Sequence, residues 1–122
     1  FTVRLDSGVL GFKFGEVSFS TNDADENPFN FAITGTVFAG PEIAVLGNAL
    51  NIPDNDTTPR LADGTDFGTA VLGGATVSHT FTVRNTGGAP LTLGAVTVPT
   101  GFTLTEALSA SLAAGACNTP SS

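Results

Sequence analysis

Short stretches of alternating apolar and polar residues run along most of this chain. The clearest is TFTVRNTGGAPLTL, residues 80–93, where Phe81 and Val83 alternate with polar residues, an Asn/Gly/Pro cluster intervenes, and the alternation resumes at Leu91. Strict alternation is typical of a half-buried strand, and such a cluster is typical of a tight turn. We therefore predict a strand, a turn and a second strand over this stretch.

Residues 1–40 repeat the pattern. Strands are predicted over Phe1–Leu5, Val9–Ser20 and Pro28–Val37, joined as an antiparallel meander. The apolar phase shifts at Gly15, which predicts a β-bulge in the second strand. The apolar residues that these strands offer to a core are Phe1, Val3, Phe12, Phe14, Phe19, Phe29, Phe31 and Ile33.

The remainder of the chain predicts further short strands around a long polar loop. The strands are expected over Glu42–Leu46, Gly47–Ile52, Phe67–Leu72, Ala75–Arg84, Leu91–Val98 and Phe102–Thr105, and Glu106–Cys117 predicts either a strand or one helical turn. The loop is Pro53–Asp66. Strands spaced about 8–12 residues apart and divided by Gly, Pro and Asn turns indicate an all-β chain built as a β-sandwich.

The composition of the chain says more about its possible partners than about its fold. The 122 residues carry a net charge of −7 and only four Lys and Arg, so we expect no nucleic-acid partner. No apolar run is long enough for a bilayer, so no membrane insertion is expected. The aromatic residues are ten Phe with no Trp or Tyr, which favours packing over ligand capture. A start at Phe1 indicates a processed product or a piece of a longer protein.

Three parts of the chain resemble a known family. The first is TFTVRNTGGAPLTL followed by PTGFTL, the second is the closing segment VSFSTNDADENPFNFAITGTV (residues 17–37), and the third is the opening segment PEIAVLGNALNI (residues 41–52). They are similar to the immunoglobulin-like repeats called choice-of-anchor D. These repeats are related to hydin, abnormal-spindle and PapD-like domains. The resemblance implies an immunoglobulin-like sandwich of about 7–8 antiparallel strands. It also implies modular bacterial proteins, secreted or at the cell surface, with structural or adhesive roles and no enzyme activity.

The order of the segments departs from the family. Residues 1–40 resemble the C-terminal strands of one repeat, and residues 41–122 resemble the N-terminal strands of the next, as in a cyclically permuted frame. The chain could be a self-closed permuted domain, a window on a longer array, or a unit whose copies complete one another. Self-closure is disfavoured, because residues 38–40 span only about 10 Å and the return path along a domain is roughly 25–35 Å.

The function expected from this pattern is structural. The chain would be a subunit or repeat of an extracellular or cell-surface filament, sheath or stalk, assembled head-to-tail from identical copies that complete a sandwich across unit boundaries. The alternative is an adhesin-type or carbohydrate-binding module of a large surface protein.

Calcium is the one cofactor that the sequence suggests. Asp54, Asp56, Asp63 and Asp66 lie in the long polar loop, and Ca²⁺ takes six to eight oxygen ligands. The spacing is not that of an EF-hand, and turn chemistry explains the same residues, since Asp side chains bond to their own backbone. A second acidic cluster, Asp23, Asp25 and Glu26, is interpreted as a turn.

Other reactive residues predict no catalytic site. His79 is expected at the margin of an apolar face, and no G-x-S-x-G context accompanies it. Cys117 is the only cysteine and could be inert, a cross-link to a second copy or, least favoured, a nucleophile. Asn55-Asp56-Thr57 fits the N-glycosylation sequon.

Overall fold

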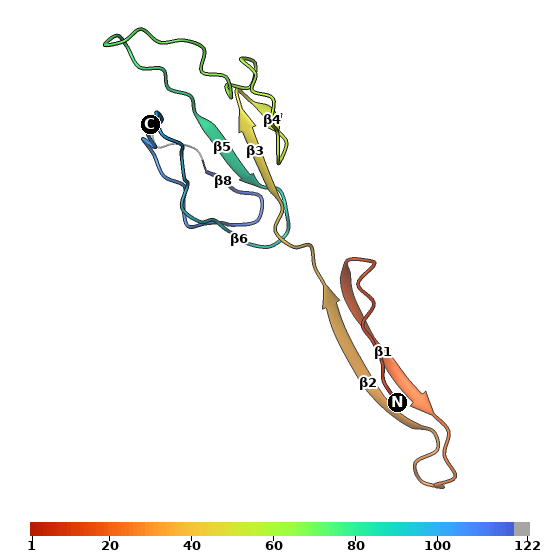
Figure 1. The fold of residues 1–122 in the computed structure, drawn as a ribbon. Helices are drawn as coiled ribbons and strands as arrows, with labels where there is room; N and C mark the ends of the chain where they lie inside the picture. The colour runs from red at the N-terminus through yellow and green to blue at the C-terminus, as the bar shows by residue number, and fades with distance from the viewer. Residues whose placement is uncertain (119–122) are drawn as a thin grey trace. The chain divides into compact units, whose positions relative to one another are not determined.

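A computed structural model describes residues 1–118, which form eight β-strands and no helix (Figure 1). All strand pairs are antiparallel. The prediction of an all-β chain is therefore confirmed, and the antiparallel sheets are consistent with a β-sandwich. The part of the chain that is described contains no long apolar helix of the kind that crosses a bilayer. The chain divides into two compact units, Phe1–Ala39 and the part from Gly40 onward. Their assignment to two successive repeats stays a prediction.

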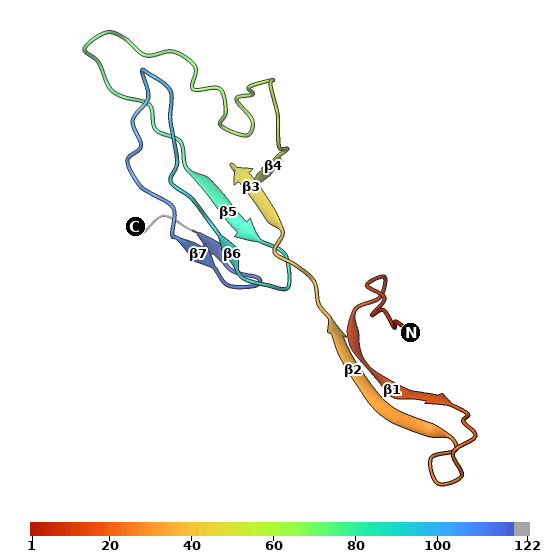
Figure 2. The same cartoon turned by 60° about the horizontal axis from the view of Figure 1, so that its bottom comes forward.

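The first unit is a long β-hairpin (Figure 2). Strand β1 (Gly11–Phe19) pairs with β2 (Phe29–Val37) in unbroken register from Gly11 opposite Val37 to Phe19 opposite Phe29. The predicted bulge at Gly15 is wrong, because Gly15 pairs with Ile33 in the regular register. The apolar phase shift in the sequence is instead a change of face.

The regular register gives this hairpin two different faces. We call one the Phe31 face; it carries Val17, Phe19, Phe29, Phe31 and Ile33 toward the loop, and Lys13, Val37 and three glycines toward the other end. The opposite one, the Phe14 face, carries Phe12 and Phe14 among Glu16, Ser18, Asn30, Ala32, Thr34 and Thr36. On each face two rings stack, Phe19 on Phe29 with centroids 5.5 Å apart and Phe12 on Phe14 with centroids 5.8 Å apart.

Residues 1–6 form a strap across the Phe31 face rather than the predicted strand. The ring of Phe1 lies 5.9 Å from that of Phe19 and 6.5 Å from that of Phe31. Leu5 lies over Gly35, where an added Cβ would sit 2.9 Å from both Leu5 methyl carbons. The strap joins no strand ladder, so the predicted three-stranded meander is a two-stranded hairpin held against a strap by side chains.

The second unit contains two small sheets. One has the order β4-β3-β5-β8, built from β3 (Ile43–Gly47), β4 (Leu50–Ile52), β5 (Phe81–Asn85) and β8 (Cys117–Asn118); the other pairs β6 (Leu91–Thr92) with β7 (Ser111–Leu112). Most of the predicted strand Gly47–Ile52 is confirmed, since Gly47 ends β3 and Leu50–Ile52 is β4, but residues 48–49 between them form a tight turn. Asn48 and Ala49 both have positive φ, 49° and 64°, as a two-residue type I′ hairpin requires.

Asn85 holds the two sheets together. Its side chain is 1% exposed, and its amide nitrogen donates to the carbonyl oxygens of Ala89 (2.7 Å), Leu112 (3.2 Å) and Ala113 (3.2 Å). Its carbonyl oxygen accepts from the backbone N–H groups of Glu42 and Gly87. This network links β3, β5 and β7 beside the two buried apolar side chains of the described chain, Val83 and Leu112.

Several predicted strands of the second unit have no ladder partner among the described residues. Of Ala75–Arg84 only the part from Phe81 onward is strand, and of Leu91–Val98 only the first two residues are. Phe67–Leu72 and Phe102–Thr105 form no strand, and Glu106–Cys117 contains β7 and the first residue of β8 rather than a helical turn. Within the described chain, residues 75–80 and 94–98 make no backbone–backbone hydrogen bond. These segments therefore have alternating apolar and polar residues but form no strand ladder within the described chain.

Candidate functional site

The carboxylates of the long polar loop are bound within the loop itself. Asp56 accepts from the backbone N–H of Thr58 and from the guanidinium of Arg60, both at 2.9 Å. The pKa of Asp56 is lowered, first by the Thr58 N–H and then by Arg60. Asp66 accepts from the Gly68 N–H at 2.8 Å, and Asp54 accepts from the amide of Asn55 at 2.9 Å. These contacts are the local turn contacts that Asp favours.

Asp63 is the buried member of this loop, at 2% exposure. One carboxylate oxygen accepts from the Thr65 hydroxyl at 2.6 Å and from the Thr65 N–H at 3.0 Å, and the other lies 3.7 Å from Nε of Arg60. The Thr65 hydroxyl, followed by the Thr65 N–H, lowers the pKa of Asp63. The Asp63 carbonyl lies so close to Gly47 of β3 that a Cβ on that glycine would collide with it. Asp63 thus fixes the loop onto the sheet.

The four aspartates of the calcium prediction do not converge. Among the described residues, the only acidic group of three or more with ligand atoms within 4.8 Å of one another is Asp23, Asp25 and Glu26. Arg60 pairs with both Asp56, at 2.9 Å, and Asp63, at 3.7 Å. Calcium binding by the long loop stays a prediction. A melting temperature that neither millimolar calcium nor chelator changes would count against it.

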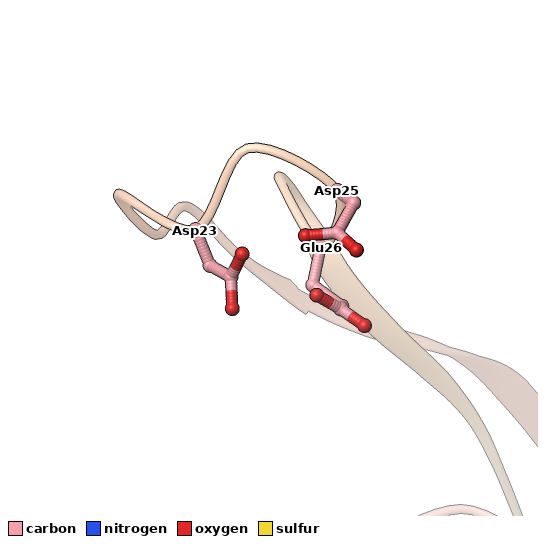
Figure 3. Close-up of side chains that lie close together, drawn as sticks. All are labelled: Asp23, Asp25 and Glu26. Carbon is pink, nitrogen blue, oxygen red and sulfur yellow. The ribbon is translucent and has the colours of Figure 1, made fainter.

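The three carboxylates that do converge lie on the exposed loop between β1 and β2 (Figure 3). Thr21 organises this loop: its hydroxyl accepts from the Asp23 N–H at 2.8 Å and donates to the Glu26 carbonyl at 3.3 Å. A hydrogen bond with Asp23 is the main cause that lowers the pKa of Asp25. All three carboxylates are exposed, and exposed acidic groups commonly cluster without an ion. The turn interpretation accounts for the loop.

His79 connects the long loop to the strand that leads into β5. Its Nδ1 lies 2.6 Å from the carbonyl oxygen of Gly64, and because a carbonyl only accepts, Nδ1 carries the proton. The imidazole stacks on Phe67 with a centroid separation of 4.4 Å, and Phe102 meets Phe67 edge-on at 5.2 Å. Cys117 is exposed in β8, opposite Arg84. His79 is exposed, and its contacts with Gly64 and Phe67 are structural ones.

The most unusual surface of the first unit is apolar. None of residues 1–39 is buried, and Phe19, Phe29, Phe31 and Ile33 remain 39–44% exposed with the strap in place. Phe1 and Val3 of the strap are more exposed still. Phe12 and Phe14, at 64% and 80% exposure, lie on the other face, so the predicted set of core-facing residues does not share one face. The regular register at Gly15 is the reason.

The second unit contains an open apolar groove of about 710 Å³. We call it the acceptor groove; its apolar lining includes Val77, Val83, Val96, Val98, Phe102 and Leu104. Val83 is its buried floor, and the other five side chains are 36–49% exposed. The sequence predicts an apolar groove where residues 41–122 lack the strands of residues 1–40, but it did not predict which residues line the groove, because the lining segments were assigned to paired strands. The signal that could have found it is the apolar alternation of residues 94–98 and 102–104.

The chain matches no family model, no curated protein and no solved structure.

Proposed function

We propose that this protein is a structural subunit that assembles with identical copies of itself, head-to-tail. Each copy completes an immunoglobulin-like β-sandwich of a neighbour, and the assembly forms a filament, sheath or stalk outside the cell or on its surface. The resemblance of three segments to choice-of-anchor D repeats of bacterial proteins supports this assignment. The absence of Trp and Tyr, the usual sugar platforms, weighs against the carbohydrate-binding alternative.

The observation that carries the proposal is the lack of a core in the first unit. A two-stranded hairpin is at best marginally stable in water without a further sheet or other cover on its apolar face. Here nine residue pairs form a regular ladder, yet no residue of 1–39 is buried. Contiguous exposed apolar surface marks interaction sites. The Phe31 face therefore requires a partner.

The pairing of the strands favours an extended chain of copies. Within the described residues, β1 and β2 pair only with each other, so each leaves one free edge that can add a strand. A contact between two different surfaces of identical units is heterologous, and it produces open filaments unless its rotation closes a ring. A free strand edge on each copy thus allows one copy after another to be added.

Sedimentation velocity over a wide concentration range, with electron microscopy of the same samples, tests the proposal. We expect the 122-residue chain to form larger species as concentration rises, and to form linear particles at the highest concentrations. A monodisperse monomer at every concentration would contradict the proposal.

A further inference from the structure

We propose that the occupant of the acceptor groove is the Phe31 face of the β1–β2 hairpin of a second copy. This inference rests on the proposed function and specifies the contact through which copies would assemble. It assigns one surface of the first unit as donor and one surface of the second unit as acceptor.

The walls of the acceptor groove have the form of an incomplete sheet. The ladder of β5 with β3 ends at Phe81 opposite Gly47, and residues 75–80 before it belong to no strand. The ladder of β6 with β7 ends at Thr92 opposite Ser111, with one further backbone bond from Leu93 to Ala110. Beyond it, residues 94–105 belong to no strand (Figure 2), and Val96, Val98 and residues 101–105 line the groove.

Unpaired backbone selects a strand over a small apolar ligand as the occupant. The groove volume, about 710 Å³, would by itself suit a small molecule. However, residues 75–80 and 94–98 make no backbone–backbone hydrogen bond within the described chain. When apolar cover removes water, their N–H and C=O groups need hydrogen-bond partners. A hairpin supplies both: the free edge of β1 or β2 offers backbone partners, and the Phe31 face beside that edge covers the apolar lining, as in strand addition.

The two hairpin faces differ in a way that selects the Phe31 face. The Phe14 face has two exposed rings, but its other residues are mostly polar, and Asn30 donates to Glu16 there at 3.1 Å. The Phe31 face presents aromatic and β-branched side chains that are 39–44% exposed, close to the 36–49% of the groove walls. Each surface has the partial cover expected of one layer of a sandwich without its opposing layer.

Disulfide trapping between copies tests this contact. In a Cys117→Ser background, one protein carries Phe31→Cys and another carries Val98→Cys; the two are mixed under mild oxidant, and cross-linked peptides are identified by mass spectrometry. Thr34→Cys replaces Phe31→Cys in the control, because Thr34 is exposed on the same strand but on the Phe14 face. We expect about tenfold more cross-link with Phe31→Cys than with Thr34→Cys.

The outcomes separate this inference from the proposed function. If Phe31→Cys and Thr34→Cys cross-link to Val98→Cys equally, and sedimentation shows that the protein still assembles, the proposed docking surface is wrong but self-assembly stands. Absence of any cross-link in a monomeric protein would overturn both. A chain carrying Phe31→Cys and Val98→Cys together distinguishes self-closure: an intrachain disulfide at high dilution, with none between copies, would overturn the inference.

Discussion

The two units of this chain achieve order in opposite ways. The hairpin has long strands, nine paired positions and no buried residue. The second unit has ladders of only two to five residues, yet it buries Val83, Leu112, Asn85 and Asp63. Regular pairing and a core are therefore separate properties. The first unit has the pairing and lacks the core, and the second has a small core held by polar side chains.

The largest expected effect comes from breaking the polar centre of the second unit. Asn85→Asp keeps the size of the side chain but replaces the donor that bonds three carbonyl oxygens with an acceptor. We expect a loss of about 3 kcal/mol or more in the free energy of unfolding. Urea unfolding followed by circular dichroism measures it, since the chain has no Trp or Tyr for fluorescence.

Asn51→Asp is the matched control for that change. Asn51 is exposed in β4, so its substitution should alter stability by less than about 0.5 kcal/mol. Equal effects of the two changes would show that Asn85 does not hold the sheets together.

Breaking the donor surface should impair assembly. Phe31→Asp places a charge at the centre of the Phe31 face, and Ala32→Asp places the same charge one residue away on the Phe14 face. We expect Phe31→Asp to weaken self-association by about tenfold or more, with little effect from Ala32→Asp. Sedimentation velocity compares the two. If both variants assemble like the unchanged protein, the Phe31 face is not the donor.

An acid titration tests the role of Asp63. Its pKa is lowered in the folded protein, so its ionised form contributes stability above the ordinary value of about 3.8, and this contribution disappears as pH falls through the lowered folded value. Below pH 5, the unchanged protein should therefore lose stability more steeply than Asp63→Asn. Thermal unfolding at several pH values measures this, with Asp54→Asn, in the exposed part of the same loop, as control. Parallel pH curves for all three proteins would contradict it.

The smallest effect is expected at the strap. Gly35→Val would push against the flexible end of Leu5, whereas Gly15→Val, on the same face, meets nothing within 4 Å. We expect Gly35→Val to release residues 1–6 to faster hydrogen exchange, with a stability change below about 1 kcal/mol. Unchanged exchange of the strap in both variants would show that Leu5 does not hold it in place.

Predictions from the sequence were correct where they depended on neighbouring residues and failed where they depended on distant ones. Period-two alternation located β2 almost to the residue and placed Phe29, Phe31 and Ile33 on one face, because that face is a local property of the strand. The same pattern failed at Phe1–Leu5 and in the second half of Leu91–Val98, because alternation does not supply a pairing partner. Gly15 was misinterpreted for a related reason, since a shift of phase can mark a bulge or two apolar faces.

The candidate sites show the same limit. The sequence identified Asp63 as acidic, but its burial depends on Thr65, Arg60 and a close approach to Gly47. Asn85 appeared as a turn residue, although its amide reaches Leu112, which is 27 positions away. Contacts across that separation depend on topology, which the composition of a turn does not encode.

Hydrogen exchange at low and high protein concentration tests the central claim most directly. If copies complete one another, the amides of β1, β2 and residues 94–98 should gain protection as concentration rises, while the backbone amide of Asn85, bonded to Ala116 within the second unit, should exchange at one rate throughout. Equal protection of the hairpin at every concentration would contradict assembly through this surface.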